Sequence, residues 1–243
     1  QADTMFAHAD TFKIFTYNID TDSVYRIMHG YHHMRVFHND VQAVCDSMVY
    51  DSRDSLLIMY QDPILWQAGQ QQLGEEIRMF FGNGNIDSVQ VLRQALSVER
   101  IDSIHYNQVS GHEMHSYFRE GELYLTTSVG NVFVNYYPFD EDSVMIEMNH
   151  TETSLLKMFL RDKKVERIWM PAATGTMYPI VLIPENMRYL QNFAWFDYIR
   201  PRDKYDLFEW RPKKSGTELK ESVRHPAPRQ KLSDIKKQRG IVS

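Results

Sequence analysis

Carboxylate side chains are the residues of this 243-residue chain whose type and spacing first suggest chemistry. Asp46, Asp51, Asp54 and Asp62 fall in one short stretch, and two carboxyls about 5 to 10 Å apart hydrolyse glycosidic bonds when burial raises one pKa. These acids stand beside turn residues or recur once per repeat, which favours a role in turns. The chain also lacks Gly-x-Ser-x-Gly, phosphate-loop and His-Glu-x-x-His motifs, so we expect no enzyme and no catalytic residue.

An acid recurs within a short phrase made of a small residue, an acid, a polar residue and a large apolar residue. The phrase is clearest at residues 9–12, 45–48 and 74–77. Spacings of 36, 29, 38 and 39 positions separate the anchor acids Asp10, Asp46, Glu75, Glu113 and Glu152. Such a period indicates a repeated supersecondary unit. We interpret each acid as the start of a pair of strands.

Histidine and cysteine are the other candidates for chemistry. His29, His32, His33 and His38 form the densest histidine group, but His32 and His33 would point to opposite faces of a strand. No regular set of three converges, so we expect no metal and no cofactor. Cys45 is the only cysteine and has no internal disulfide partner, so we interpret it as a small buried residue.

The elements that must position these residues are strands. Apolar and polar residues alternate with period two at 34–36, 77–81, 132–136 and 144–148, and turn residues such as 82–85 and 119–122 separate the runs. No alternation of strand and long helix occurs, and the apolar runs are about five residues, far below the roughly 18 that cross a bilayer. The pattern predicts an all-β fold of antiparallel hairpins in a sandwich, a jelly roll or an open curved sheet.

Composition divides the chain into three parts. We expect β repeats over 1–179, an aromatic-rich capping segment over 180–210 with a helix that starts at Pro184, and a basic, disordered tail over 211–243. The tail holds 10 Lys/Arg against 3 Asp/Glu, and the rest holds 17 against 29. A basic tail attracts anionic partners, but the absence of aromatic residues there favours a solvated terminus without nucleic acid. The chain opens at Gln1, close to the first phrase, so we expect the natural start, with any signal peptide, to be missing.

Several blocks resemble a known family. Residues 3–11, 31–37, 41–50, 59–66 and 188–195 are similar to the OstA-like family, relatives of the lipopolysaccharide transport protein LptA. The most specific block runs from Cys45-Asp46-Ser47 to Asp62-Pro-Ile-Leu-Trp66. The resemblance implies a β-taco, an open β-jellyroll folded into a V with an apolar inside. It also implies a periplasmic protein of the outer-membrane assembly machinery that shields acyl chains of lipopolysaccharide, or of its lipid A part, and pairs with other transport proteins through edge strands.

The candidate lipid groove follows from strand parity. The residues that keep one parity along their strands are Val132, Val134, Tyr136, Val144, Ile146, Met148, Leu156 and Met158. Parity alone does not distinguish a groove from a closed core, and the resemblance favours the groove.

The expected function is therefore non-enzymatic lipid binding in lipopolysaccharide transport. One alternative is a structural β-repeat scaffold that binds protein partners through edge strands or the basic tail. Another is polysaccharide binding on exposed Trp66 and Trp169.

Overall fold

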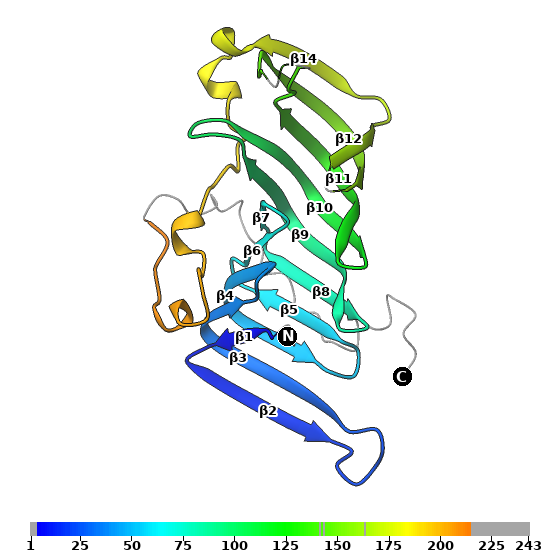
Figure 1. Ribbon diagram of the computed structural model, residues 1–243, viewed down its shortest axis with the longest axis vertical. Helices are drawn as coiled ribbons and strands as arrows, with labels where there is room; N and C mark the ends of the chain where they lie inside the picture. The colour runs from blue at the N-terminus through cyan, green and yellow to red at the C-terminus, as the bar shows by residue number, and fades with distance from the viewer. Residues whose placement is uncertain (1–3, 141, 143, 163, 215–243) are drawn as a thin grey trace. The chain divides into compact units, whose positions relative to one another are not determined.

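The computed structural model describes residues 4–140, 142, 144–162 and 164–214 (Figure 1). These residues form one sheet of 14 antiparallel strands. The strands are β1 (Phe6–His8), β2 (Thr11–Tyr17), β3 (Tyr25–Phe37), β4 (Val41–Asp51), β5 (Leu56–Tyr60), β6 (Ile64–Gln67), β7 (Gln70–Leu73), β8 (Glu76–Gly82), β9 (Asn85–Arg100), β10 (Tyr106–Arg119), β11 (Glu122–Tyr136), β12 (Glu147–Arg161), β13 (Lys164–Trp169) and β14 (Thr174–Pro179). The all-β prediction is confirmed. No helix in the described part is long and apolar enough to span a membrane.

The sheet is folded over along a line that crosses the long strands. In β4, residues 41–44 pair with β6 and residues 47–51 pair with β5. In β9, residues 96–99 pair with β7, and the residues before Arg93 pair with β8. One side of the bend, the first arm, holds β1, β6, β7 and β14, and the other, the second arm, holds β2, β5, β8 and β13. The two arms are the β-taco that the sequence predicts.

Backbone conformation produces the bend in alternate strands. Pairs of consecutive residues adopt positive φ at His32 and His33, at Arg93 and Gln94, and at Gly130 and Asn131. Left-handed residues interrupt the pleat of a strand and turn its direction. The ladder between β11 and β12 shifts register at the same place, between Val129 and Val132.

The recurring acids mark this bend instead of the hairpin turns. The Asp10 carboxylate lies 2.8 Å from His33 Nδ1, and the Asp46 carboxylate lies 3.2 Å from His32 Nδ1. Arg93 Nε donates to Glu75 at 3.0 Å. Asp46 lies inside β4, so the interpretation of each acid as the start of a strand pair is wrong for this copy. The repeat instead places a carboxylate where neighbouring strands bend together.

Hydrophobic residues of both arms fill the V along β3 to β9. This core contains Met34, Met48, Met59, Ile77 and Met79, each at most 2% exposed. Cys45 is buried in the same core, and burial raises the pKa of its thiol. The closed half of the V is thus packed like an ordinary protein interior.

The segment after β14 crosses the outer face of the first arm. It contains the single 3₁₀ turns η1 (Ile180–Leu182), η2 (Glu185–Met187), η3 (Asp197–Ile199) and η4 (Asp206–Phe208) in place of the helix predicted from Pro184. Side chains of the sheet donate hydrogen bonds to backbone carbonyls that would accept intrahelical hydrogen bonds in a helix. Asn135 donates to Met187 O at 2.9 Å, and Gln108 donates to Arg188 O at 3.0 Å.

The aromatic residues of this segment do not form one cluster. Trp195, Phe196 and Tyr198 pack with the outer face of the first arm. The Phe208 ring instead lies 5.0 Å from His8, and the Trp210 ring lies 4.4 Å from His33. The predicted basic tail lies outside the described residues from position 215 onward.

Candidate functional site

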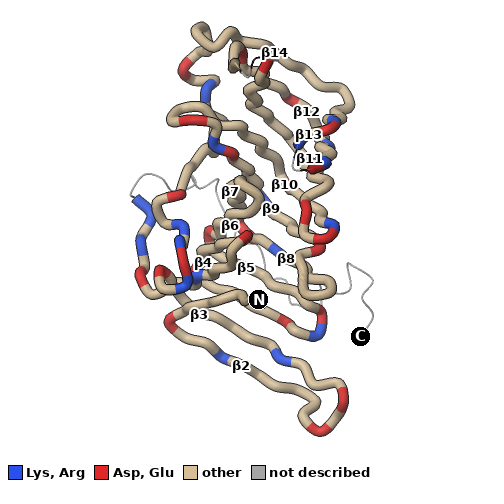
Figure 2. Tube along the Cα trace, viewed as in Figure 1, with Lys and Arg blue, Asp and Glu red and all other residues tan. Residues whose placement is uncertain are grey.

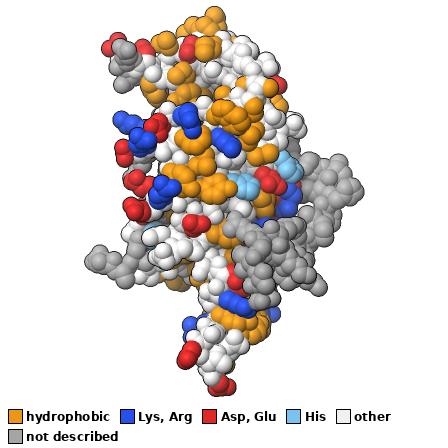
Figure 3. Space-filling model, turned by 90° about the vertical axis from the view of Figure 1, so that its right-hand side faces the viewer, with side chains coloured by type: hydrophobic (Ala, Val, Ile, Leu, Met, Phe, Trp, Pro, Cys, Tyr) orange, Lys and Arg blue, Asp and Glu red, His pale blue; other side chains and the backbone are white. Residues whose placement is uncertain are grey.

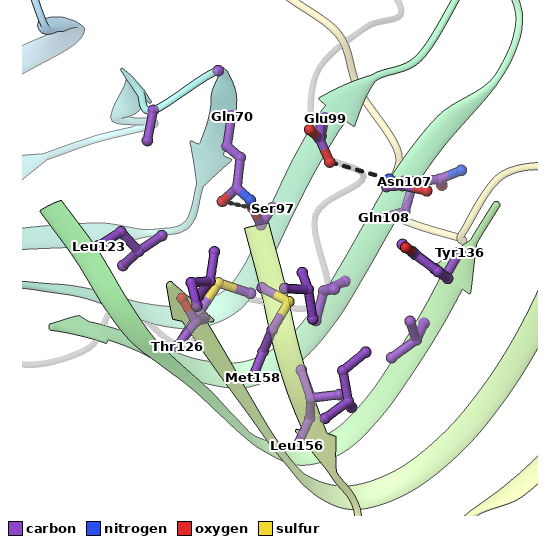
Figure 4. A pocket seen from close by; sticks show the side chains of 18 of the residues that line it. Gln70, Ser97, Glu99, Asn107, Gln108, Leu123, Thr126, Tyr136, Leu156 and Met158 are labelled. Atoms are coloured by element: carbon purple, nitrogen blue, oxygen red, sulfur yellow. Dashed lines mark hydrogen bonds between the residues drawn. The ribbon is translucent and has the colours of Figure 1, made fainter. Parts of the chain in front are cut away.

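An open cleft of about 390 Å³ lies between the two arms over β9 to β13. Val109 and Val134 line it from the first arm, and Leu123, Leu156 and Met158 line it from the second. Further lining residues of the second arm are Met114, Thr126, Leu160, Val165 and Ile168. Figure 4 shows Leu123, Thr126, Leu156 and Met158 on one side of this space. The V that is filled along β3 to β9 is therefore hollow in its C-terminal half.

Small residues create the hollow. In the second arm, a cross-strand row begins with Met59, Ile77 and Val91 and continues through Met114 to Ser128. In this first row the small residue is Ser128 of β11. The next row passes from large residues in β5 and β8 to small ones in both β10 and β11, namely Leu57, Met79, Val89, Ser116 and Thr126. Small side chains at β10 and β11 leave room between the arms that the large ones occupy elsewhere.

Polar side chains lie where the strands of the first arm end, away from the bend. Gln70, Glu99 and Asn107 are cross-strand neighbours, and Tyr136 follows Asn135, the β11 partner of Gln108. Asn107 Nδ2 donates to Glu99 Oε2 at 3.1 Å, and Ser97 Oγ donates to Gln70 Oε1 at 3.1 Å. We call Gln70, Glu99, Asn107 and Tyr136 the lip row. The cleft thus has an apolar floor and a polar lip (Figure 4).

Five of the eight predicted groove residues come together here. Val134, Tyr136, Leu156 and Met158 line the cleft. Val132 is fully buried beneath it and packs with Val134 and Leu156.

The other three predicted residues do not reach the cleft. Val144 and Ile146 precede β12, which begins at Glu147, and are 51% and 54% exposed. Met148 packs with Tyr137 and Ile183 on the opposite face. Between Thr153 and Leu155 the strand bends, so inward positions are odd-numbered before the bend and even-numbered after it. A single parity along 144–158 therefore misplaces Met148.

Sequence reasoning missed the lining residues of β10 and β13. Val109 and Met114 lie on either side of the bend in β10 and differ in parity, so alternation alone does not group them. Val165 and Ile168 also differ in parity, because a register shift separates them. The signal available in the sequence was the apolar–polar alternation of each short run taken separately.

The other chemical candidates lie elsewhere. His32 and His33 sit at the bend, and the described residues contain no group of three or more His, Cys, Asp or Glu placed to hold a metal. Asp51 is buried and accepts a hydrogen bond from the Arg53 backbone N–H at 2.9 Å. Trp66 is 1% exposed, so the prediction that it binds polysaccharide at the surface is wrong. Burial raises the pKa of Tyr137 to about 12.

Comparisons with known proteins give a structural likeness. No family model matches the chain, and no curated protein matches it. A solved structure of LptH from Pseudomonas aeruginosa, described as the LptA-homologous periplasmic component of the lipopolysaccharide transport device, is similar to this chain. The two share 12% identity with a TM-score of 0.41, and the match covers 57% of this chain and 93% of LptH. The OstA-like resemblance of the sequence stays a prediction.

Proposed function

We propose that this protein binds acyl chains of a lipid in the cleft between its two arms and catalyses no reaction. The observation that carries the proposal is the open apolar floor formed by Val134, Leu156, Met158 and Ile168. Its volume of about 390 Å³ falls in the range of roughly 300 to 1,000 Å³ that small-molecule sites occupy. Each methylene removed from water stabilises the complex by about 0.8 kcal/mol, without directional chemistry.

The finer proposal is a role in lipopolysaccharide transport in the periplasm. Its support is the OstA-like resemblance, which covers about residues 2–210, together with a fold whose sheet ends in free edges. Among the described residues, β2 pairs only with β3, and β13 and β14 pair only with β12. Unpaired edges accept a strand of another protein, which is how we propose that other transport components join this one.

Replacing Met158 by Asp tests the cleft. A carboxylate on the apolar floor would have to lose its hydration when an acyl chain enters, so we expect binding of a fluorescent fatty acid to fall by at least about tenfold, or roughly 1.4 kcal/mol. The matched control is Ile146→Asp, which adds the same charge at an exposed position outside the cleft. A folded Met158→Asp protein that binds like the control would contradict the proposal.

The β-repeat scaffold is kept as a second candidate because of β2. All seven of its residues are exposed, and Phe12, Ile14, Phe15 and Tyr17 are between 38% and 59% accessible. Such an apolar edge suits a protein partner. Mass spectrometry of a lipid extract of the purified protein separates the two functions, since a scaffold would carry no acyl species.

A further inference from the structure

The lip row is a built polar arrangement. Asn107 is held on both sides, because its Nδ2 donates to Glu99 and its Oδ1 accepts the Tyr137 backbone N–H at 2.9 Å. Gln70, the neighbour of Glu99 on β7, is held by the hydroxyl of Ser97. Figure 4 shows Glu99, Asn107 and Tyr136 along the same side of the cleft. A carboxylate is therefore fixed beside the place where the polar end of a bound amphiphile would emerge.

The charged residues that line the cleft have one sign. Among its described lining residues the charged side chains are Glu99 of the first arm and Glu122 of the hairpin between β10 and β11 on the second. Neither Lys, Arg nor His lines the cleft in the described part of the chain. An ionised carboxylate only accepts hydrogen bonds, and it repels another anion.

We propose that the mouth of the cleft selects amphiphiles whose polar group donates hydrogen bonds and carries no negative charge, such as a hydroxyl, amide or amine group. Glu99 is the acceptor, and Asn107 is the positioning residue that orients its carboxylate. This inference rests on the proposed acyl-chain binding and narrows it. In a lipid that carries both phosphate and amide groups, the amide end lies at the lip row and the phosphate stays outside.

The experiment compares two probes with the same 12-carbon tail. N-(2-hydroxyethyl)dodecanamide and dodecyl phosphate are each titrated against a fluorescent fatty acid held in the cleft, below their micelle concentrations and at low salt. Their tails contribute equally, so the ratio of their affinities reports the head group. We expect the amide to bind at least about fivefold more tightly, the factor that two like charges about 4 Å apart in water produce.

Glu99→Gln removes the charge and keeps the shape of the side chain, so the ratio should fall to about twofold, with Glu122 still present. The matched control is Glu152→Gln, at a carboxylate outside the cleft lining, which should keep the wild-type ratio. A wild-type ratio near one, a preference for phosphate, or an unchanged ratio in Glu99→Gln would overturn the head-group inference and leave acyl binding standing. Failure of both probes and of the fatty acid to bind would overturn the proposed function and this inference together.

Discussion

Single small residues decide where the V is hollow. Ser116, Thr126 and Ser128 stand at inward positions of β10 and β11, where the strands of the closed half carry Met, Leu and Ile. Gly111 lies at the bend of β10, the strand that also carries Ser116. These residues give the sequence no hydrophobic signal, yet Thr126 lines the cleft, and Ser116 and Ser128 are buried on the same two strands. A groove predicted from apolar residues alone therefore lacks the residues that open it.

Gly111→Ala should destabilise the protein by about 1 to 3 kcal/mol, because the added methyl group would collide with the buried Ser128 Oγ and lie 3.3 Å from the Val129 carbonyl oxygen. Urea unfolding measures the change as a lower midpoint. Gly82→Ala is the matched control, since its methyl group would meet only Asp87 Cβ at 3.7 Å. Equal midpoints for the two variants would show that the bend of β10 tolerates a side chain.

At the scale of elements, the C-terminal segment is held to the sheet by amide side chains on its outer face. Gln42, Gln71, Gln108 and Asn135 each bond to this segment. Gln71 is fully buried, donates to Ala194 O at 2.8 Å and accepts from Phe196 N–H at 2.7 Å. Two backbone groups of an irregular segment thereby gain the partners that a strand or helix would supply.

Gln71→Leu should therefore cost about 2 to 4 kcal/mol of unfolding free energy, since it leaves a buried N–H and a buried carbonyl without partners. Hydrogen exchange should rise first in residues 187–200, the part that the amide holds. Gln90→Leu, at a half-buried position of β9 in the second arm, serves as the control. Uniform exchange across the whole sheet in Gln71→Leu would mean that the segment does not depend on this contact.

At the scale of the whole sheet, the V has a packed half along β3 to β9 and an open half beyond it. Charged residues gather at the turns and in the C-terminal segment (Figure 2). On the face that Figure 3 presents, hydrophobic side chains gather in the upper half, the part that holds β10 to β14 in Figure 1. Val165 and Ile168 of β13, which line the cleft, are 41% and 40% exposed. The apolar surface that is closed along β3 to β9 thus becomes accessible at the C-terminal end.

Two methionine truncations should report this difference. Met59→Ala removes a fully buried side chain from the closed half and should cost about 2 to 5 kcal/mol, whereas Met158→Ala, at a half-buried position of the cleft, should cost less than about 1.5 kcal/mol. Thermal or urea unfolding of both variants measures the two costs. Similar large costs would indicate that the cleft is closed and packed in solution.

The sequence by itself determined that the chain folds into antiparallel strands joined by turns. Alternation with period two and frequent turn residues leave few folds other than antiparallel hairpins, because hairpins are local and alternation is a property of each strand. The same local information placed Val134, Tyr136, Leu156 and Met158 on one inward face.

Only the tertiary structure decided what depends on the bend. The bend exchanges odd and even positions within β12, so Met148 faces outward although it shares its parity with Leu156. It also placed Asp46 inside β4, beside His32 at the fold line, and brought Glu99 and Asn107 beside an apolar floor built by other strands. Alternation specifies the two faces of a straight strand. Which face becomes the inside of a V depends on where neighbouring strands bend together, and that is a property of the whole sheet.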